Sequence, residues 1–138
     1  MAGSEFQLKI ITPERVMYDR PVRRVIFQTT EGELAVLKGH IPLTAIIQSS
    51  VFPILPEAES GTEELILAVH EGFAEIRPDQ VSILTESAEW PHEIDTERAE
   101  QARKRAEDRL RLQHPNVDVV RAELALRRSL IRLEIAKK

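Results

Sequence analysis

Charged residues near the start of one candidate helix and near the end of another form the most chemically distinctive pattern in this 138-residue sequence. Asp95 precedes Arg98 by three residues, and Ala99 follows directly. Further along the chain, Arg128 and Arg132 lie one helical turn apart and therefore share a face. Guanidinium groups bind phosphates through paired hydrogen bonds, and a helix N-terminus adds unpaired N–H groups and a positive dipole end. These residue types predict a polyphosphate site wherever the fold brings them together.

Two antiparallel helices are the elements that must bring these side chains together. A helical period begins at Ile94, and its apolar side recurs every three or four residues, at Ala99, Ala102, Ala106 and Leu110. Pro115 cannot continue that helix, and a second amphipathic segment follows. With the turn centred near His114, antiparallel packing places Arg98 opposite about residue 131. The three arginines are then expected at the open end of the hairpin.

The same residues also have a purely structural interpretation. Asp95 is a good N-cap, because its side chain can accept hydrogen bonds from the first N–H groups of the helix. Arg128 and Arg132 suit a solvated face near a helix C-terminus, where cations are favoured. In the ligand interpretation, Asp95 and Glu89 instead accept hydrogen bonds from an exocyclic amine such as that of adenine. Spacing alone leaves both interpretations open.

The region before the helices reads as a series of short strands. Apolar stretches alternate with polar residues and are broken by Gly, Pro and acidic turns, which is the pattern of an all-β sandwich or barrel. The expected strands cover 6–12, 23–30, 33–37, 43–48, 51–55, 64–70, 72–78 and 80–84. The fold class is therefore β + α: an antiparallel β-sandwich over residues 1–88, then an antiparallel αα-hairpin within residues 89–138.

Composition excludes several classes of function. There is no Cys, so disulfides and thiolate metal sites are absent. No phosphate loop, nucleophile elbow or metal-binding His spacing occurs, and the four His are dispersed, so we expect no catalytic or metal site. No apolar run reaches membrane-spanning length, and no signal peptide is visible. Residues 1–88 carry 7 basic and 13 acidic residues, whereas residues 89–138 carry 12 and 10, so the basic excess lies in the hairpin.

Four segments, in the same order along the chain, resemble the epsilon subunit of bacterial F-type ATP synthases. They are "LKIITPERVMYD" (8–19), "EGELAVLKGHIPL" (31–43), "EGFAEIRPDQVSIL" (71–84) and "RAELALRRSLIRL" (121–133). Three positions depart from the family pattern: Lys38 stands where proline is usual, Glu71 replaces the first of two usual glycines, and Ala35 replaces a common glycine. These departures concern local turn geometry.

The resemblance implies a non-catalytic rotor subunit with a sandwich of about ten strands. The sandwich would bind the gamma subunit and sit on the c-ring through the loop that contains Glu31, Gly39, His40 and Pro42. The hairpin, when extended, would meet acidic segments of the catalytic alpha and beta subunits and block ATP hydrolysis. Its positive charge would come from Arg121, Arg127, Arg128, Arg132, Lys137 and Lys138. The subunit would be peripheral to the cell inner membrane, on its cytoplasmic side, without a transmembrane segment.

The resemblance also bears on the arginine pattern. Bacterial epsilon subunits that bind ATP carry a motif similar to I/L-D-x-x-R-A on the first helix and R-x-x-x-R on the second. The matching residues here are Glu89, Ile94, Asp95, Arg98, Ala99, Arg128 and Arg132. ATP is therefore expected as a regulatory ligand of the folded hairpin, in which these arginines meet.

Two alternatives remain. The chain can be the same rotor subunit without nucleotide binding at physiological concentration. It can also be a stand-alone adaptor whose basic hairpin binds nucleic acid, although it lacks aromatic residues interleaved with the basic ones for base stacking and a strongly basic domain. We therefore expect no nucleic-acid partner.

Overall fold

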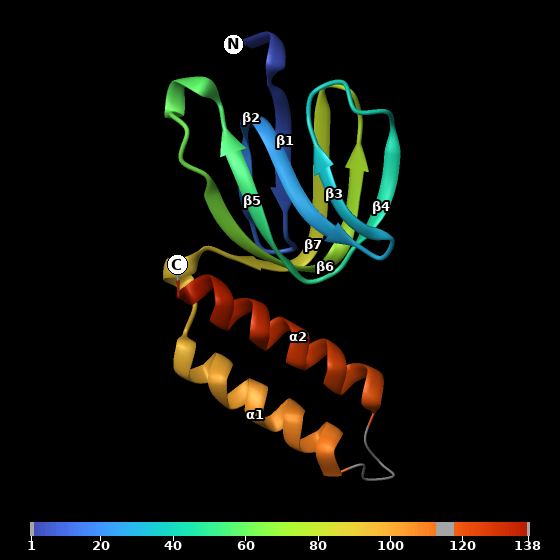
Figure 1. Ribbon diagram of the computed structural model, residues 1–138, viewed down its shortest axis with the longest axis vertical. Helices are drawn as coiled ribbons and strands as arrows, with labels where there is room; N and C mark the ends of the chain where they lie inside the picture. Colours follow the sequence, from blue (N-terminus) through green and yellow to red (C-terminus); the bar gives the residue numbers. More distant parts are fainter. Residues whose placement is uncertain (1, 113–117, 138) are drawn as a thin grey trace. The chain divides into compact units, whose positions relative to one another are not determined.

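A computed structural model describes residues 2–112 and 118–137 (Figure 1). The chain divides into two compact units, Met1–Glu89 and Trp90–Lys138. The boundary between the units falls one residue later than the expected boundary between residues 88 and 89.

The first unit contains seven β-strands among its described residues. They are β1 (Phe6–Ile11), β2 (Val16–Thr29), β3 (Gly32–Val36), β4 (Leu43–Ile47), β5 (Ser50–Pro56), β6 (Leu65–Ile76) and β7 (Gln80–Glu89), with short 3-10 turns η1 (Ala2–Ser4) and η2 (Ala58–Ser60). The count is lower than the expected ten or so, in part because the predicted strands 64–70 and 72–78 form the single strand β6. β2 and β7 are also longer than predicted, since each continues past its apolar centre to pair with further neighbours.

The strands form one sheet that closes on itself. Neighbours run in the order β1, β7, β6, β4, β2, β3, with β5 between β2 and β6, and β1 also pairs with β2. All of these pairs are antiparallel, as expected, except β1 and β7, which are parallel. The exception arises because the first and last strands of the unit lie side by side, and no tight turn has to join them.

The core of the sandwich consists of inward-facing side chains from alternating strand positions. β5 alternates buried and half-buried residues along its whole length, as a strand with one covered face should. Phe27 and Phe52 stack with ring centroids 5.0 Å apart. Around them lie fully buried aliphatic side chains, including Leu8, Ile10, Val25, Ile54, Leu67, Ile76 and Ile83.

A local irregularity in β6 explains the glycines that the family usually carries there. Glu71 has a φ of +22°, the only positive φ at a non-glycine residue that the described chain shows. Glycine adopts such a backbone without strain, whereas a side chain is strained. Here the Glu71 carboxylate accepts a hydrogen bond from Ser49. At Gly72, a Cβ atom would lie 2.0 Å from the carbonyl oxygen of Leu84, so only glycine fits without a shift of the backbone.

The second unit contains a 3-10 turn and two α-helices. They are η3 (Pro91–Glu93), α1 (Thr96–Leu112) and α2 (Val119–Ala136). Asp118 is the N-cap of α2 and accepts a hydrogen bond from the Arg121 N–H at 3.0 Å. The turn that was expected near His114 lies outside the described residues. None of the described helices is both long enough and apolar enough to cross a membrane.

The two helices form an antiparallel hairpin with a small-residue interface (Figure 1). The buried positions of α1 are Ala99 and Ala106, and those of α2 are Ala122, Ser129 and Ile135. Alanine and serine let helix axes approach closely, but they remove little apolar surface from water. The hairpin therefore has close backbone packing without a large core.

Candidate functional site

The first half of the predicted phosphate motif lies at the N-terminus of α1. The Arg98 N–H donates to Oδ1 of Asp95 at 3.1 Å, and the Ala99 N–H donates to the Asp95 carbonyl at 3.0 Å. Asp95 therefore caps the helix, as its structural interpretation predicted. Arg98 is exposed, and Ala99 is buried, with 3% of its surface exposed. Ala99 thus serves close packing, whereas the side chain of Arg98 is exposed at the helix terminus.

The second half of the motif lies in the last two and a half turns of α2. Arg128 and Arg132 are both half-buried, although they belong to a helix with many exposed positions. The alignment of α2 against α1 can be read from a groove that residues of both helices line. These residues are Glu100 and Arg103 of α1 and Leu130, Leu133, Glu134 and Lys137 of α2. By this register Arg98 lies level with about residue 137, roughly one and a half turns beyond the predicted partner at 131. The offset leaves Arg132 about one and a half turns from Arg98 along the hairpin and Arg128 about two and a half turns away.

Helical geometry places the three arginines on one side of the hairpin. Each residue advances about 100° around a helix, so Arg98 lies about 200° around α1 from Glu100. Arg132 likewise lies about 200° around α2 from Leu130 and from Glu134. Since Glu100, Leu130 and Glu134 line the groove, the arginines belong to the side of the hairpin away from it. This shared side is the arrangement that a polyphosphate ligand requires.

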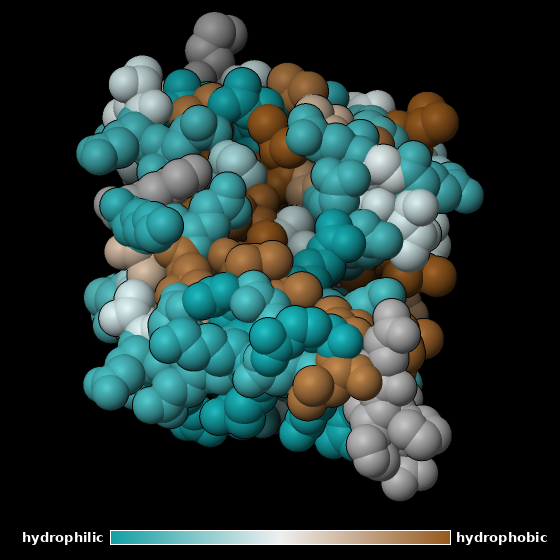
Figure 2. All heavy atoms as spheres, turned by 60° about the horizontal axis from the view of Figure 1, so that its bottom comes forward, coloured by the Kyte–Doolittle hydropathy of each residue, from teal (hydrophilic) through white to brown (hydrophobic). Residues whose placement is uncertain are grey.

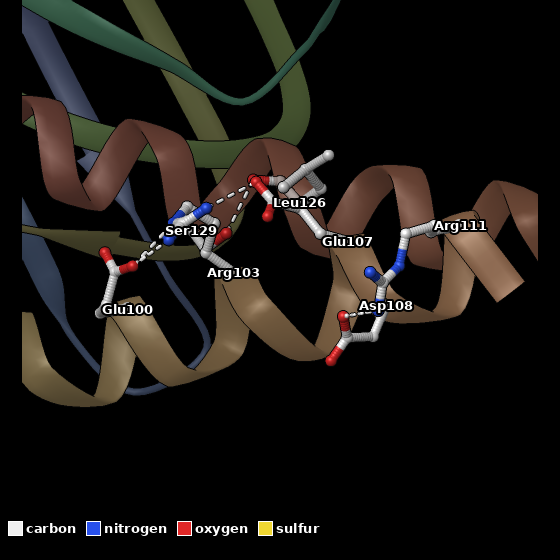
Figure 3. A network of polar contacts seen from close by, with 7 residues as sticks. All are labelled: Glu100, Arg103, Glu107, Asp108, Arg111, Leu126 and Ser129. Carbon is white, nitrogen blue, oxygen red and sulfur yellow. Dashed lines mark hydrogen bonds and ion pairs between the residues drawn. The ribbon is translucent and has the colours of Figure 1, made fainter.

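The groove side of the hairpin carries a self-contained network of ion pairs (Figure 3). Arg103 pairs with Glu100 one turn before it and with Glu107 one turn after it, the latter at 2.6 Å. The hydrogen bond from Arg103 lowers the pKa of Glu100, and both glutamates raise the pKa of Arg103. The groove itself has a volume of about 520 Å³. The charge of Arg103 on this side of the hairpin is therefore balanced by the two glutamates.

Glu89, the predicted acceptor for an adenine amine, belongs to the first unit as the last residue of β7. Its Oε1 lies 3.0 Å from Nε2 of His70. His70, one of the four dispersed histidines, is completely buried. No sequence motif links the two residues, because the pairing depends on the register of β6 against β7.

The sandwich carries an apolar row on its outer surface that strand prediction does not reveal. Ile46 on β4 is paired with Phe73 on β6, which is paired with Leu84 on β7. These three side chains are 59%, 53% and 50% exposed. Cross-strand neighbours on one face lie within contact distance, so the row is continuous. A contiguous exposed apolar row is typical of a protein-binding surface.

A second exposed apolar feature is the loop between β3 and β4. Leu37 and Ile41 are 56% and 74% exposed, and Leu43 follows at the start of β4. The Gly39 N–H donates to the Pro78 carbonyl at 2.7 Å, and the φ of Gly39 is +87°. This bond ties the loop to the turn between β6 and β7, so the apolar side chains are presented on a fixed backbone. In contrast, the visible face of the hairpin in Figure 2 is mostly hydrophilic.

Comparisons with known proteins match the whole architecture. Residues 5–91 match the family model of the ATP synthase delta/epsilon chain β-sandwich domain, and residues 92–137 match that of the delta/epsilon chain long α-helix domain. The ATP synthase epsilon chain of Bacillus licheniformis is 42% identical over 95% of this chain and 97% of its own length. The epsilon chain of Shouchella clausii is 45% identical over 95% and 94%.

A solved structure supports the fold. A chain of the Euglena gracilis mitochondrial ATP synthase, in a structure of OSCP, F1 and c-ring, superimposes with a TM-score of 0.78. The alignment covers 97% of this chain and 82% of that one at 23% identity. The fold and the matched domains define a non-catalytic subunit built from a β-sandwich and a helical domain. The chain belongs to the family of ATP synthase epsilon chains, the subunits of the central stalk of F-type ATP synthase.

Proposed function

We propose that this chain is a rotor subunit whose sandwich binds the gamma subunit and the c-ring, and whose hairpin inhibits ATP hydrolysis unless ATP holds it folded. The observation that carries the ATP part is the common side of Arg98, Arg128 and Arg132 on the hairpin, next to the N-terminus of α1. Membership of the epsilon family supports the rotor part.

The two apolar surfaces of the sandwich support binding to neighbouring subunits. The row formed by Ile46, Phe73 and Leu84 offers an apolar face suited to contact with another folded protein, such as gamma. The loop that carries Leu37 and Ile41, with Gly39, His40 and Pro42 between or beside them, offers exposed apolar side chains for a contact with the c-ring. Association through these contacts would make the subunit peripheral to the inner membrane on its cytoplasmic side.

ATP would stabilise the folded hairpin because only that form brings both halves of the motif together. The triphosphate would be bound by the guanidinium groups of Arg98, Arg128 and Arg132. The N–H groups of the first turn of α1 and its dipole add to the attraction for an anion. Ile94 would contact the base, while Ala99 and Asp95 keep the helix terminus in place. A ligand that binds one state alone shifts the equilibrium toward that state as its concentration rises.

At low ATP the hairpin would open and extend. Its small-residue interface makes this change feasible, because separating α1 from α2 exposes little apolar surface of Ala99, Ala106 and Ala122. The extended second helix would then present basic side chains to acidic segments of the catalytic alpha and beta subunits. Opposite charge on the two surfaces favours both the encounter and its orientation. The basic residues of this helix and its end are Arg121, Arg127, Arg128, Arg132, Lys137 and Lys138, of which Lys138 lies outside the described part of the chain.

Titration calorimetry of the isolated chain with ATP tests nucleotide binding. Arg128→Ala and Arg132→Ala are each expected to weaken binding at least tenfold, since each removes a charge-assisted contact worth about 1.5–3 kcal/mol. Arg127→Ala is the matched control, because it removes the same charge from a position about 100° around α2. Absence of binding up to millimolar ATP would reject the clamp and leave the rotor subunit without a nucleotide. Equal losses in all three variants would indicate a general charge effect.

Truncation tests the inhibitory part. The assembled enzyme reconstituted with residues 1–89 is expected to hydrolyse ATP faster than the enzyme with the full chain, because no hairpin can reach the catalytic subunits. Retention of the truncated chain in the complex shows that the sandwich alone binds its partners. Unchanged hydrolysis would remove the inhibitory role but keep the rotor assignment. Failure of residues 1–89 to bind gamma would overturn the partner assignment itself.

A further inference from the structure

One side of α2 carries a groove that residues of this helix alone line. They are Val120, Glu123, Leu124, Leu126, Arg127 and Leu130. Val120, Leu124 and Leu130 are 66%, 40% and 47% exposed. Ala122 and Ser129, which are buried in the helix interface, lie about 140° and 160° around α2 from Arg127. The groove therefore lies on the side of α2 that faces away from α1.

The spacing of the groove residues matches the seam of a coiled coil. Four of them follow one another at intervals of three, four and three residues, which is the alternation of the a and d positions in a heptad. These four are Val120, Glu123, Arg127 and Leu130. The two remaining leucines of the groove flank the seam. This side of α2 therefore has the pattern of a helix that packs against a further helix.

The order of residue types along this seam is complementary to its own reverse. When α2 is laid antiparallel against a second copy, with the two-fold axis level with Ala125, each residue meets the one equally far on the other side of Ala125. Val120 then meets Leu130, and Glu123 meets Arg127. The symmetry makes each contact twice, with opposite charges in the middle and apolar contacts at both ends. A parallel arrangement in register would instead set Glu123 against Glu123 and Arg127 against Arg127, which opposes it.

We propose that a second copy of this chain occupies the groove, through an antiparallel, two-fold symmetric contact between the two α2 helices. Charged residues at seam positions fix the register and orientation of paired helices. Arg127 also has an interaction within its own chain, but a guanidinium group has five N–H donors and can serve more than one acceptor. The dimer covers the apolar side of α2 in the unassembled chain.

The dimer is weak and independent of nucleotide. A single helix face buries less than the roughly 1,200–2,000 Å² of a standard protein interface, so the dimer forms only at micromolar or higher concentration. Arg128 and Arg132 lie about 100° and 140° around α2 from Arg127, so the contact leaves the side of the predicted phosphate motif uncovered. The inference goes beyond the proposed function and does not rest on ATP binding.

Charge reversal in the full chain tests the contact, with sedimentation equilibrium from micromolar to millimolar concentration as the measurement. Arg127→Glu sets carboxylates against each other at two places and is expected to raise the dimer Kd at least about tenfold. Glu123→Arg should have the same effect through two pairs of guanidinium groups. The double variant restores opposite charges and should recover the wild-type Kd to within about threefold. Arg121→Glu is the matched control, because it makes the same change of charge about 120° around α2 from Arg127.

Disulfide formation tests the orientation, because the chain contains no Cys of its own. Equal amounts of a Val120→Cys chain and a Leu130→Cys chain are mixed and gently oxidised. The mixed disulfide is expected to predominate, since the antiparallel contact sets position 120 of one copy against position 130 of the other. Predominance of the two disulfides between identical chains would overturn the antiparallel arrangement.

The remaining outcomes are equally decisive. A wild-type chain that stays monomeric at millimolar concentration overturns the proposal, and so does a double variant that dimerises no better than the single ones. Equal weakening by Arg121→Glu would assign the effect to net charge and would also overturn it. Should a charge variant lose helix content by circular dichroism, the disulfide experiment decides, because its chains keep both charges. Absence of the dimer would leave the proposed ATP binding standing, and absence of ATP binding would leave the dimer.

Discussion

The β-sandwich and the helical hairpin bury very different side chains. The sandwich buries Phe27, Phe52 and a shell of Leu, Ile and Val whose neighbours come from distant parts of the sequence. The hairpin buries mainly alanines and Ser129, and its two helices are adjacent in the sequence. Burial of large apolar side chains supplies most of the free energy of unfolding, and each such side chain contributes several times as much as a buried alanine. The sandwich is therefore expected to be a rigid body, and the hairpin an element that can open at low cost.

This difference suits the two proposed roles. A body that transmits rotation must keep its shape, whereas an arm that responds to ATP needs two states separated by only a few kcal/mol. The polar surface of α1, with Arg103 bridging Glu100 and Glu107, helps the helix to persist when its partner is removed. The exposed Val120, Leu124 and Leu130 of α2 add apolar surface for another contact. Three predictions test the contrast between the units.

The largest effect is expected in the sandwich. Phe52→Ala removes a fully buried ring that stacks on Phe27, and should lower the free energy of unfolding of the sandwich by about 3–5 kcal/mol. Urea denaturation followed by Tyr18 fluorescence measures this loss. Phe73→Ala is the control, since Phe73 is 53% exposed and its loss should cost less than about 0.5 kcal/mol. Equal effects of the two variants would contradict the core assignment.

A smaller effect is expected at the helix interface. Ala106→Leu inserts a branched side chain where 2% of the residue surface is exposed, and overpacking of this kind costs about 1–3 kcal/mol. The variant should loosen the hairpin and leave the urea midpoint of the sandwich unchanged. Hydrogen exchange of α2 measures the loosening, and Lys104→Leu, at an exposed position of the same helix, is the control. A shift of the sandwich midpoint would show that the two units do not behave independently.

The smallest effect is expected from lowering the pH, which should weaken the ion pair of Glu100 on α1. The Arg103 hydrogen bond lowers the pKa of Glu100 below its ordinary value of 4.5 in the folded helix. A carboxyl with a lowered folded pKa stabilises the fold above its unfolded pKa, and this contribution disappears as pH falls through the folded pKa. Helicity at 222 nm should therefore decline as pH falls below about 4.5. Glu100→Gln should show less of this decline, and an identical pH profile would exclude the ion pair as its cause.

Strand positions could be predicted closely, but their connections could not. Alternation located β1, β3, β4 and β5 to within one residue at most ends, because a half-buried strand imposes a period of two on its sequence. The early residues of β2, from Val16 to Val22, were missed because a proline and charged residues weaken that signal. The merging of two predicted strands into β6 depended on Gly72, whose missing side chain leaves room for the backbone of β7.

In the candidate site, too, local positions could be predicted from the sequence, but contacts between elements could not. Local spacing identified Asp95 with Arg98, and Arg128 with Arg132, because a helix repeats every 3.6 residues. The register between the helices differed from the prediction by about one and a half turns, since it depends on how Ala99, Ala106, Ala122 and Ser129 interlock. His70 and Glu89, which are 19 residues apart, had no sequence signal at all.

The amino-acid sequence by itself determined the class of fold and the family, and it supplied the residues proposed to recognise phosphate, because periodicity, composition and motif spacing are local properties of the chain. Only the tertiary structure decided that β1 pairs in parallel with β7, that Ile46, Phe73 and Leu84 form one surface, and that the buried His70 lies against Glu89. These features depend on strand register, in which a shift of one residue turns every side chain to the opposite face. Register is set by the packing of the whole core, and no short stretch of sequence contains it.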